Sequence, residues 1–329
     1  MIAKCNNTYI SKLSEKGNHL ITFFTPTFNR APFLSRIEDF LVNQTCKNFV
    51  WIIVNDGSKD NTDEVVKEIL RRELLPVKFI SKPNGGKHSA FKAALEACET
   101  TYFQCMDDDD IYLENAVEFF VKKWAEIKSE NNDEIGAIRT LSRYPDGTFV
   151  TNFQVKIDEE YDASTIETNF VMKRRQENWT CYDTAKLRSV DLFKNYWMDQ
   201  QQKFLSEGIW QTRFARKYKC RYVHQCYREY RSDDNVSLSR SIKNRQHYVD
   251  VFLNEKLVLD EQIDLVLKYN KLSIPKRIML VNCLRDYLDI KYIDLLRNTQ
   301  SCFLKFCYIL TWIPSLFGKY IIEFAVKYR

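Results

Sequence analysis

Residues 102–112 read Tyr-Phe-Gln-Cys-Met-Asp-Asp-Asp-Asp-Ile-Tyr, an apolar stretch that runs directly into four aspartates. The apolar part, 102–106, has the length and composition of a buried strand. Because side chains alternate along a strand, Asp107 and Asp109 should project to one side and Asp108 and Asp110 to the other. A charge run of this kind can also be a solvated surface or a helix cap. Carboxylates this close at a partly buried strand end repel one another unless a cation lies between them, and oxygen ligands favour Mg²⁺ or Mn²⁺.

Three further apolar runs precede this one, at residues 19–25, 49–54 and 76–80, and each is followed by a polar loop. Helical patterns occupy the gaps between strands and the residues after the aspartates, at about 32–43, 60–73, 87–99 and 114–128. Regular alternation of strands and helices predicts an α/β fold with a mixed, mostly parallel sheet flanked by helices.

The alternation stops beyond residue 130. Shorter strand candidates at 135–140, 148–155 and 178–183 predict an extension of the same sheet. From about residue 240 the pattern is helical with long apolar faces, after a polar loop at 231–239. We therefore expect a nucleotide-binding and catalytic domain over residues 1–238 and a helical C-terminal region over 239–329.

In open α/β sheets the ligand lies beyond the carboxyl ends of the strands, so the loops after the four strands are the candidate site. Ahead of the aspartates these loops read Thr25-Pro-Thr-Phe-Asn-Arg30, Asn55-Asp-Gly-Ser58 and Pro83-Asn-Gly-Gly-Lys-His88. No G-x-G-x-x-G follows any strand, which disfavours a dinucleotide fold. The third loop also lacks the spacing and the hydroxyl residue of a P-loop.

Taken in order, the motifs TPTFNR, VNDGSKDNT, NGGKHSAFKAAL and FQCMDDDDIYLENA resemble those of the bacterial family 2 glycosyltransferases, which are inverting enzymes with the GT-A fold. The resemblance runs over about residues 19–125 and continues more weakly at 203–218.

The resemblance implies a nucleotide-sugar pocket in which Asp56 accepts a hydrogen bond from uracil and Lys87 lies near the diphosphate. It also implies a bound Mn²⁺ or Mg²⁺ with Asp109 and Asp107 as ligands. Asp108 stands where the family frequently has Ser, so which carboxylates touch the ion stays open. The full set of implied donor-binding residues is Thr25, Pro26, Thr27, Asn29, Arg30, Asp56, Gly85, Gly86, Lys87, Asp107 and Asp108.

Glu207 matches the position of the family's catalytic carboxylate, just before a helical pattern. The resemblance implies that it is the general base, which removes the proton from the acceptor hydroxyl during an inverting transfer. The alternative is an acid in the first turn of a helix, where a negative charge stabilises the helix by only about 0.3–1 kcal/mol.

The net charge of +5 is unevenly distributed, because residues 271–329 hold ten Lys or Arg and four Asp or Glu. The main body is therefore close to neutral, which argues against nucleic acid as a partner. The basic C-terminal region also contains the uncharged stretch 306–318, which is too short to span a bilayer. We expect it to contact an anionic membrane surface, although packing on the rest of the protein is an alternative. The polar N-terminus lacks a secretory pattern, which predicts a cytoplasmic protein, peripheral at the inner membrane face.

The resemblance predicts a metal-dependent transferase that moves a hexosyl or N-acetylhexosaminyl group from a nucleotide-sugar, expected to be a UDP-sugar, to a glycan or lipid-linked acceptor in cell-surface polysaccharide synthesis. A non-catalytic nucleotide-sugar or glycan-binding subunit of an assembly complex is the alternative. A nucleotidyltransferase is disfavoured because the loop at 25–30 lacks a Gly-rich, basic phosphate-binding sequence.

Overall fold

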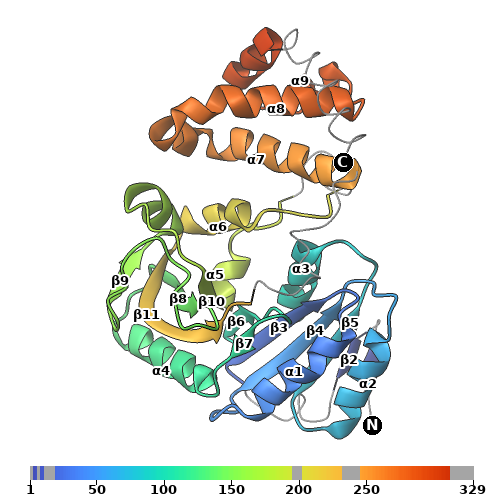
Figure 1. The fold of residues 1–329 in the computed structure, drawn as a ribbon, viewed down its shortest axis with the longest axis vertical. Coiled ribbons are helices and arrows are strands. Elements are labelled where there is room, and N and C mark those ends of the chain that lie inside the picture. Colours follow the sequence, from blue (N-terminus) through green and yellow to red (C-terminus); the bar gives the residue numbers. More distant parts are fainter. Residues whose placement is uncertain (1–2, 6–7, 11–18, 195–201, 232–244, 312–329) are drawn as a thin grey trace. The chain divides into compact units, whose positions relative to one another are not determined.

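The computed structural model describes residues 3–5, 8–10, 19–194, 202–231 and 245–311 (Figure 1). Contacts divide the chain into two compact units, Met1–Phe193 with Trp210–Val236, and Lys194–Ile209 with Ser237–Arg329. The expected domain boundary at 238/239 lies outside the described residues and stays a prediction.

The N-terminal unit is built on one sheet, which has eleven strands in the described part of the chain. Their order is β1-β2-β5-β4-β3-β6-β10-β8-β11-β7, and β9 pairs with β11. The strands are β1 (Ala3–Cys5), β2 (Thr8–Ile10), β3 (Ile21–Thr27), β4 (Phe49–Asn55), β5 (Val77–Ser81), β6 (Tyr102–Cys105), β7 (Ile111–Tyr112), β8 (Ile135–Arg143), β9 (Glu160–Ala163), β10 (Asn178–Asp183) and β11 (Lys219–Glu229).

The four neighbouring strands β5, β4, β3 and β6 run parallel, as do β8 and β11. The other pairs among the described strands are antiparallel. The predicted mixed α/β sheet is therefore confirmed, and its continuous parallel block consists of the four strands that helical crossovers connect. Apart from the parallel pair β8 and β11, the described strands outside that block pair antiparallel.

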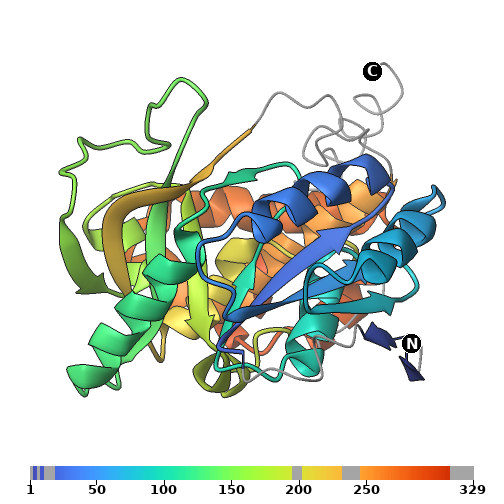
Figure 2. The same ribbon diagram turned by 90° about the horizontal axis from the view of Figure 1, so that it is seen from below.

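Both faces of the parallel strands are covered by helices. The helices of the unit are α1 (Ala31–Val42), α2 (Thr62–Arg72), α3 (Lys87–Ala97), α4 (Ala116–Ser129), α5 (Thr184–Arg188) and the part of α6 (Glu207–Ala215) from Trp210 onward. Helices α1 and α2 lie side by side in Figures 1 and 2 and share an apolar core with Phe23 and with α4. The next residue of β3, Phe24, faces the other way and contacts Phe91 of α3, with ring centroids 5.8 Å apart. Alternation along β3 thus divides the core into two layers.

All four predicted strands that precede the candidate loops, and all four predicted helices, are present within a few residues of their expected bounds. The predicted strand at 148–155 is wrong. Gly147 has φ +88, which turns the chain there, and the following segment makes only isolated bridges, Arg143 to Phe149 and Thr151 to Gln176. The segment lacks the continuous partner that a strand needs.

Buried Arg228 of β11 ties together the strands next to the candidate site. Its guanidinium lies 3.2 Å from the Asp110 carboxylate before β7 and 2.9 Å from the Glu177 carboxylate before β10. Its Nε donates to the Ser142 hydroxyl of β8 at 2.9 Å. The Arg228 and Asp110 side chains are only 6% and 2% exposed, so the pair is shielded from water. One side chain therefore fixes the ends of three other strands.

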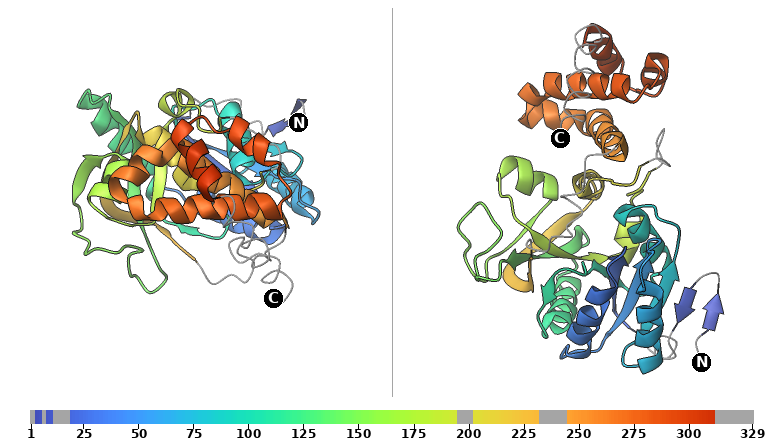
Figure 3. Two further views of the ribbon diagram at one scale, coloured as in Figure 1. Left: turned by 90° about the horizontal axis from the view of Figure 1, so that it is seen from above. Right: turned by 45° about the vertical axis from the view of Figure 1, so that its right-hand side comes forward.

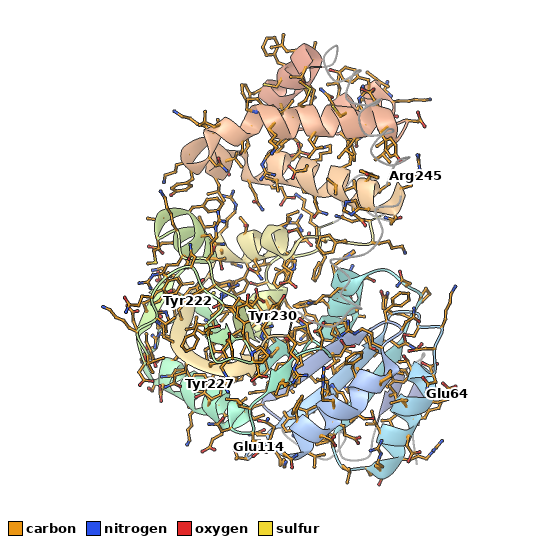
Figure 4. All side chains as sticks on the ribbon, in the orientation of Figure 1. Glu64, Glu114, Tyr222, Tyr227, Tyr230 and Arg245 are labelled. Atoms are coloured by element: carbon orange, nitrogen blue, oxygen red, sulfur yellow. The ribbon has the colours of Figure 1, made fainter. Side chains whose placement is uncertain are left out.

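The C-terminal unit is helical, with α7 (Arg245–Tyr269), a 3-10 turn (Lys271–Ser273), α8 (Ile274–Tyr287), α9 (Tyr292–Arg297) and helical residues 302–311 (Figure 3). Helices α7 and α8 pack along each other, and Phe252, Val281 and Leu295 lie in their shared core. Arg245, labelled in Figure 4, donates to the carbonyl of Leu288 at 3.1 Å. The predicted helical C-terminal extension is confirmed.

Residues 202–206 belong to this helical unit because side chains of α7 accept hydrogen bonds from backbone amides of this segment. The Lys203 amide donates to the Asp250 carboxylate and the Ser206 amide to the Asn254 side chain, each at 2.8 Å. None of the helices in the described residues is long and apolar enough to cross a membrane.

We predict that Arg228→Met destabilises the N-terminal unit by about 3–5 kcal/mol at pH 8, because it leaves the Asp110 carboxylate buried without a cation. The loss should shrink at pH 5.5, because a proton can then neutralise the unpaired Asp110. Urea unfolding followed by circular dichroism at the two pH values measures this. The matched control is Arg221→Met on the same strand, whose partners Glu130 and Asp162 have side chains 44% and 27% exposed. The control should lose about 1 kcal/mol or less. Equal losses in the two variants would contradict the prediction.

Candidate active site

The loops after β3 and β4 are fastened to each other at the carboxyl edge of the sheet. The Asp56 amide donates to the Thr27 carbonyl at 2.9 Å. Asn29 has φ 55, a conformation that Asn tolerates better than most residues. Its amide donates to the Ser58 hydroxyl at 2.9 Å, and its side-chain carbonyl accepts from the Lys59 amide at 2.7 Å. The two loops therefore form a single rigid edge.

The Asp56 carboxylate holds the third loop against this edge. Its Oδ1 accepts from Lys82 Nζ at 2.6 Å and from the Gly85 amide at 2.9 Å. Its Oδ2 accepts from the Gly86 amide at 2.7 Å and from the Asn84 side chain at 3.2 Å. A carboxylate offers about four lone-pair sites, so all of them are in use. Asp56, only 4% exposed, is thus the centre of the loop that precedes α3.

Glycine is required where these loops meet. Gly57 has φ +80, and a Cβ there would lie 2.7 Å from the Asn84 amide nitrogen. Gly86 has φ 87 and directly precedes α3. Only glycine adopts such angles without strain, so these positions let the loop backbone approach the end of β4.

Lys87, the first residue of α3, reaches the first aspartate of the run. Its Nζ lies 2.8 Å from Asp107 Oδ1 and 3.0 Å from Oδ2. Burial raises the pKa of Asp107, but the charge and hydrogen bond of Lys87 outweigh it and hold the pKa below its ordinary value. Asp107 is therefore an anion that is paired with a partly exposed cation.

Arg30 pairs with the next two aspartates from the far end of the first loop. Its Nε lies 2.8 Å from Asp108 Oδ1, and its terminal nitrogen lies 3.2 Å from Asp109 Oδ2. Arg36 of α1 donates to the Asp108 carbonyl at 2.8 Å. Asp110 is held by Arg228, as described above. Cations from three separate parts of the chain therefore neutralise the aspartate run.

The aspartates form a turn, and burial alternates along it. The side chains of Asp107 and Asp109 are 30% and 31% exposed, whereas those of Asp108 and Asp110 are buried. Burial raises the pKa of both buried carboxyls to about 7, against the opposing charges of Arg30 for Asp108 and of Arg228 for Asp110. The exposed pair is the pair that can meet a ligand.

The donor set of this exposed pair fits a hard divalent cation. Asp107 and Asp109 supply oxygen atoms, and in the described residues no three His, Cys, Asp or Glu side chains are grouped to hold a metal by themselves. Mg²⁺ is usually held by one or two carboxylates and takes its other ligands from substrate phosphates and water. The residues present therefore fit an ion that is bound together with a phosphorylated ligand.

The remaining predicted residues lie in two places. Thr25 is buried and its hydroxyl accepts from Trp51 Nε1 at 2.9 Å, while Pro26 is partly exposed. Thr27 ends β3 and its buried hydroxyl has no hydrogen-bond partner among the described residues. Glu207, at the start of α6, is exposed and belongs to the compact unit that does not contain the aspartate turn.

Arg228 and Lys82 contribute to the site although the sequence did not single them out. Arg228 is remote from every motif, in a strand whose register with β7 and β8 brings it to Asp110. Lys82 directly precedes the loop that begins at Pro83, and this position beside the motif could have identified it as a site residue.

Comparison with known proteins places these loops in a family. A profile described as Glycosyl transferase family 2 matches residues 22–197, more than half of the chain. The chain is 33% identical over 135 residues to the chondroitin synthase of Pasteurella multocida (strain Pm70), which covers 40% of this chain and 13% of the synthase. It is 30% identical over 117 residues to the uncharacterized glycosyltransferase EpsJ of Bacillus subtilis (strain 168), covering 36% and 33%. The chain thus matches well under two thirds of the length of these relatives.

Comparison with solved structures shows that the similarity includes the fold. S. aureus TarS 1–349 in complex with UDP-GlcNAc superposes with a TM-score of 0.57 at 14% sequence identity, over 89% of each chain. The mixed sheet, its flanking helices and the helical extension all agree with this architecture. The profile match and the shared fold together establish that the chain belongs to glycosyl transferase family 2 and has the GT-A fold.

Proposed function

We propose that the protein is an inverting, metal-dependent glycosyltransferase that moves a sugar from a UDP-sugar to a glycan or lipid-linked acceptor. The observation that carries the proposal is the aspartate turn, which holds two partly exposed carboxylates, Asp107 and Asp109, the first of them in contact with Lys87 at the start of α3. Oxygen ligands, an adjacent ammonium group and a helix N-terminus together match the chemistry of a nucleoside diphosphate. Family membership supports the same reaction class.

The donor would bind across the fastened loops. Residues 25–30 and Asp56 would line the nucleoside pocket, and Gly85, Gly86 and Lys87 would face the diphosphate. Because the carboxylate of Asp56 is already saturated by donors, a hydrogen bond from uracil has to replace one of them. Lys87 likewise has to exchange part of its contact with Asp107 for a phosphate oxygen. Donor binding therefore rearranges contacts that already exist within the loops.

Asp107 and Asp109 would hold Mn²⁺ or Mg²⁺, with Asp108 kept buried against Arg30. Bound there, the ion would neutralise the charge that grows on the departing diphosphate. Lys87 would add a second positive charge on the same side. Arg30 would keep the turn in place through its pair with Asp108.

Glu207 would act as the general base in an inverting transfer. Its carboxylate would take the proton from the acceptor hydroxyl as that oxygen attacks the anomeric carbon opposite the leaving group. The relatives favour the sugar class, because one solved neighbour was crystallised with UDP-GlcNAc and two partial relatives are a chondroitin synthase and a hyaluronan synthase. We infer a hexosyl or N-acetylhexosaminyl donor and a role in surface polysaccharide synthesis.

The C-terminal unit would place the enzyme at the inner face of the membrane as a peripheral protein of the cytoplasm. Helical residues 302–311 bury Leu304 and Tyr308 in the core of their unit. Another face of the same helix carries Phe303, Phe306 and Leu310, which are 53%, 57% and 62% exposed. Exposed aromatic and aliphatic side chains within a region of net positive charge suit an anionic lipid interface.

Asp109→Ala should lower transfer by about 100-fold or more, because one of the two exposed oxygen ligands is lost. Mn²⁺-dependent binding of UDP-GlcNAc, measured by calorimetry, should fall with it while the circular dichroism spectrum is unchanged. Glu64→Ala, an exposed acid on α2 labelled in Figure 4, is the control and should keep both properties. Near-normal turnover of Asp109→Ala in Mn²⁺ would refute the metal assignment. Absence of any EDTA-sensitive donor hydrolysis by the unmodified protein would favour a non-catalytic binding subunit.

The variant Glu207→Gln tests whether Glu207 is the general base. The amide keeps the size of the side chain but cannot accept the proton, so transfer should fall by about 100-fold or more while donor affinity is retained. Glu118→Gln is the matched control, because Glu118 is also an acid in the first turn of a helix, α4. Only the Glu207 variant should lose transfer. A parallel loss of donor binding and turnover would mean that Glu207 has a structural role.

Replacing Phe303, Phe306 and Leu310 together by Ser should release the protein from anionic vesicles in a flotation assay. Substitution is a sharper test than truncation before residue 302, because truncation would remove the buried Leu304 and Tyr308 from the core. Leu272→Ser is the control, since Leu272 is 89% exposed but lies outside this helix. Binding should require anionic lipid. If the unmodified protein ignores anionic vesicles, the membrane proposal fails.

A further inference from the structure

Arg139, in the middle of β8, is a buried cation without a carboxylate partner. It is 5% exposed, and the described residues place no Asp or Glu side chain in an ion pair with it. The other arginines buried in the N-terminal unit differ in this respect. Arg30 pairs with Asp108, Arg221 with Asp162, and Arg228 with Asp110. A buried charge that lacks a counter-charge is strongly destabilising, so its retention requires an explanation.

The groups around Arg139 are neutral. In the register of the sheet it pairs with Thr180 of β10 on one side and with Tyr222 of β11 on the other. Its guanidinium lies 5.8 Å from the centre of the Tyr222 ring, and its hydrogen-bond partners are the uncharged side chains of Tyr182 and Cys220. Its Nε has no hydrogen-bond partner among the described residues. Figure 4 labels Tyr222 on β11, next to β8.

A second unpartnered polar atom lies farther along the same row of side chains. The Tyr222 ring stacks on Tyr161 of β9 with centroids 4.9 Å apart, and the Tyr161 ring lies 5.6 Å from His224. His224 is fully buried, and its Nδ1 lies 3.0 Å from the Lys156 carbonyl. Its Nε2 has no partner in the described part of the chain. Most buried polar atoms in proteins have a hydrogen-bond partner, so one without a partner calls for an explanation such as a bound water or ion.

The segment that adjoins this row has the irregular backbone found at many binding sites. Thr165 and Thr168 are buried, and the hydroxyl groups of Thr165 and Tyr222 have no hydrogen-bond partner among the described residues. Thr168 belongs to the π-helical turn Glu167–Val171. Such turns occur frequently at functional sites.

We propose that Arg139 anchors an internal site for an oxyanion, a carboxylate or a phosphate group, separate from the aspartate turn. A planar guanidinium matches both groups bidentately, and the hydroxyls of Tyr182, Tyr222 and Thr165 are suitable further donors. Bound there, the anion supplies the counter-charge that the described residues do not. The site takes either free inorganic phosphate or a carboxylate, for which glucuronate is the probe, and it does not depend on the transfer reaction proposed above.

Titration of the full-length protein with sodium phosphate and with sodium glucuronate, at constant ionic strength, tests the site by calorimetry and by thermal unfolding. At roughly five times its dissociation constant, the correct anion should raise Tm by about 2–4 °C. Glucose, which is neutral, should have no effect. A response to phosphate alone identifies free phosphate as the ligand, and a response to glucuronate identifies a carboxylate. If neither anion binds the unmodified protein, the proposal is wrong.

Three variants test which residue is responsible for the anion-dependent rise in Tm. Arg139→Met should abolish the anion-dependent shift and, without ligand, unfold at a Tm equal to or above that of the unmodified protein. Arg221→Met, with its carboxylate partners, should keep the shift. Lys87→Ala should also keep it, which separates this site from phosphate bound at the start of α3. A shift that persists in Arg139→Met, or that is lost in Lys87→Ala alone, overturns the proposal.

Should Arg139→Met fail to fold, Arg139→Lys provides the comparison. The ammonium group keeps the charge but loses the planar fork, so the affinity for the anion should fall by about 10-fold or more. An unchanged affinity in this variant would overturn the assignment.

Discussion

Four consecutive carboxylates share one short turn in this protein because cations from three distant parts of the sequence neutralise them. Lys87 begins α3, Arg30 ends the loop after β3, and Arg228 lies in β11. Without these partners the mutual repulsion of the aspartates would open the turn or force several of them to bind protons. The sheet brings the three cations to the same edge, so the chemistry of the turn depends on correct pairing of strands that are far apart in sequence.

The four carboxylates of this turn have two different roles. Asp108 and Asp110 are buried and act as attachment points for Arg30 and Arg228, whereas Asp107 and Asp109 stay partly exposed. Buried ion pairs with close geometry fix a loop at the expense of desolvation. That arrangement keeps the exposed oxygens in position before any ligand arrives, which reduces the reorganisation that binding requires.

In the loops beside the turn, a buried carboxylate likewise holds the backbone in place. The carboxylate of Asp56 uses all of its acceptor sites to hold the segment from Lys82 to Gly86. This contact orders the glycine-containing loop that begins α3, and α3 in turn delivers Lys87 to Asp107. Arg139 is the exception among the buried arginines of the N-terminal unit, since its described neighbours include no acid. An additional anion would give Arg139 the counter-charge that the other buried arginines of this unit already have.

The sequence by itself determined the strands and helices of the parallel half and the loops at its carboxyl edge, because apolar runs, turn residues and helix patterns are local signals. It also determined the family, through motifs that lie within those loops. Only the tertiary structure decided that most of the outer strands pair antiparallel and that residues 148–155 form no continuous strand, since pairing depends on partners remote in sequence. Likewise, the sequence placed four aspartates after β6, but it could not assign Arg30 to Asp108 or Arg228 to Asp110. Those partnerships arise from strand register and burial, which no local pattern encodes.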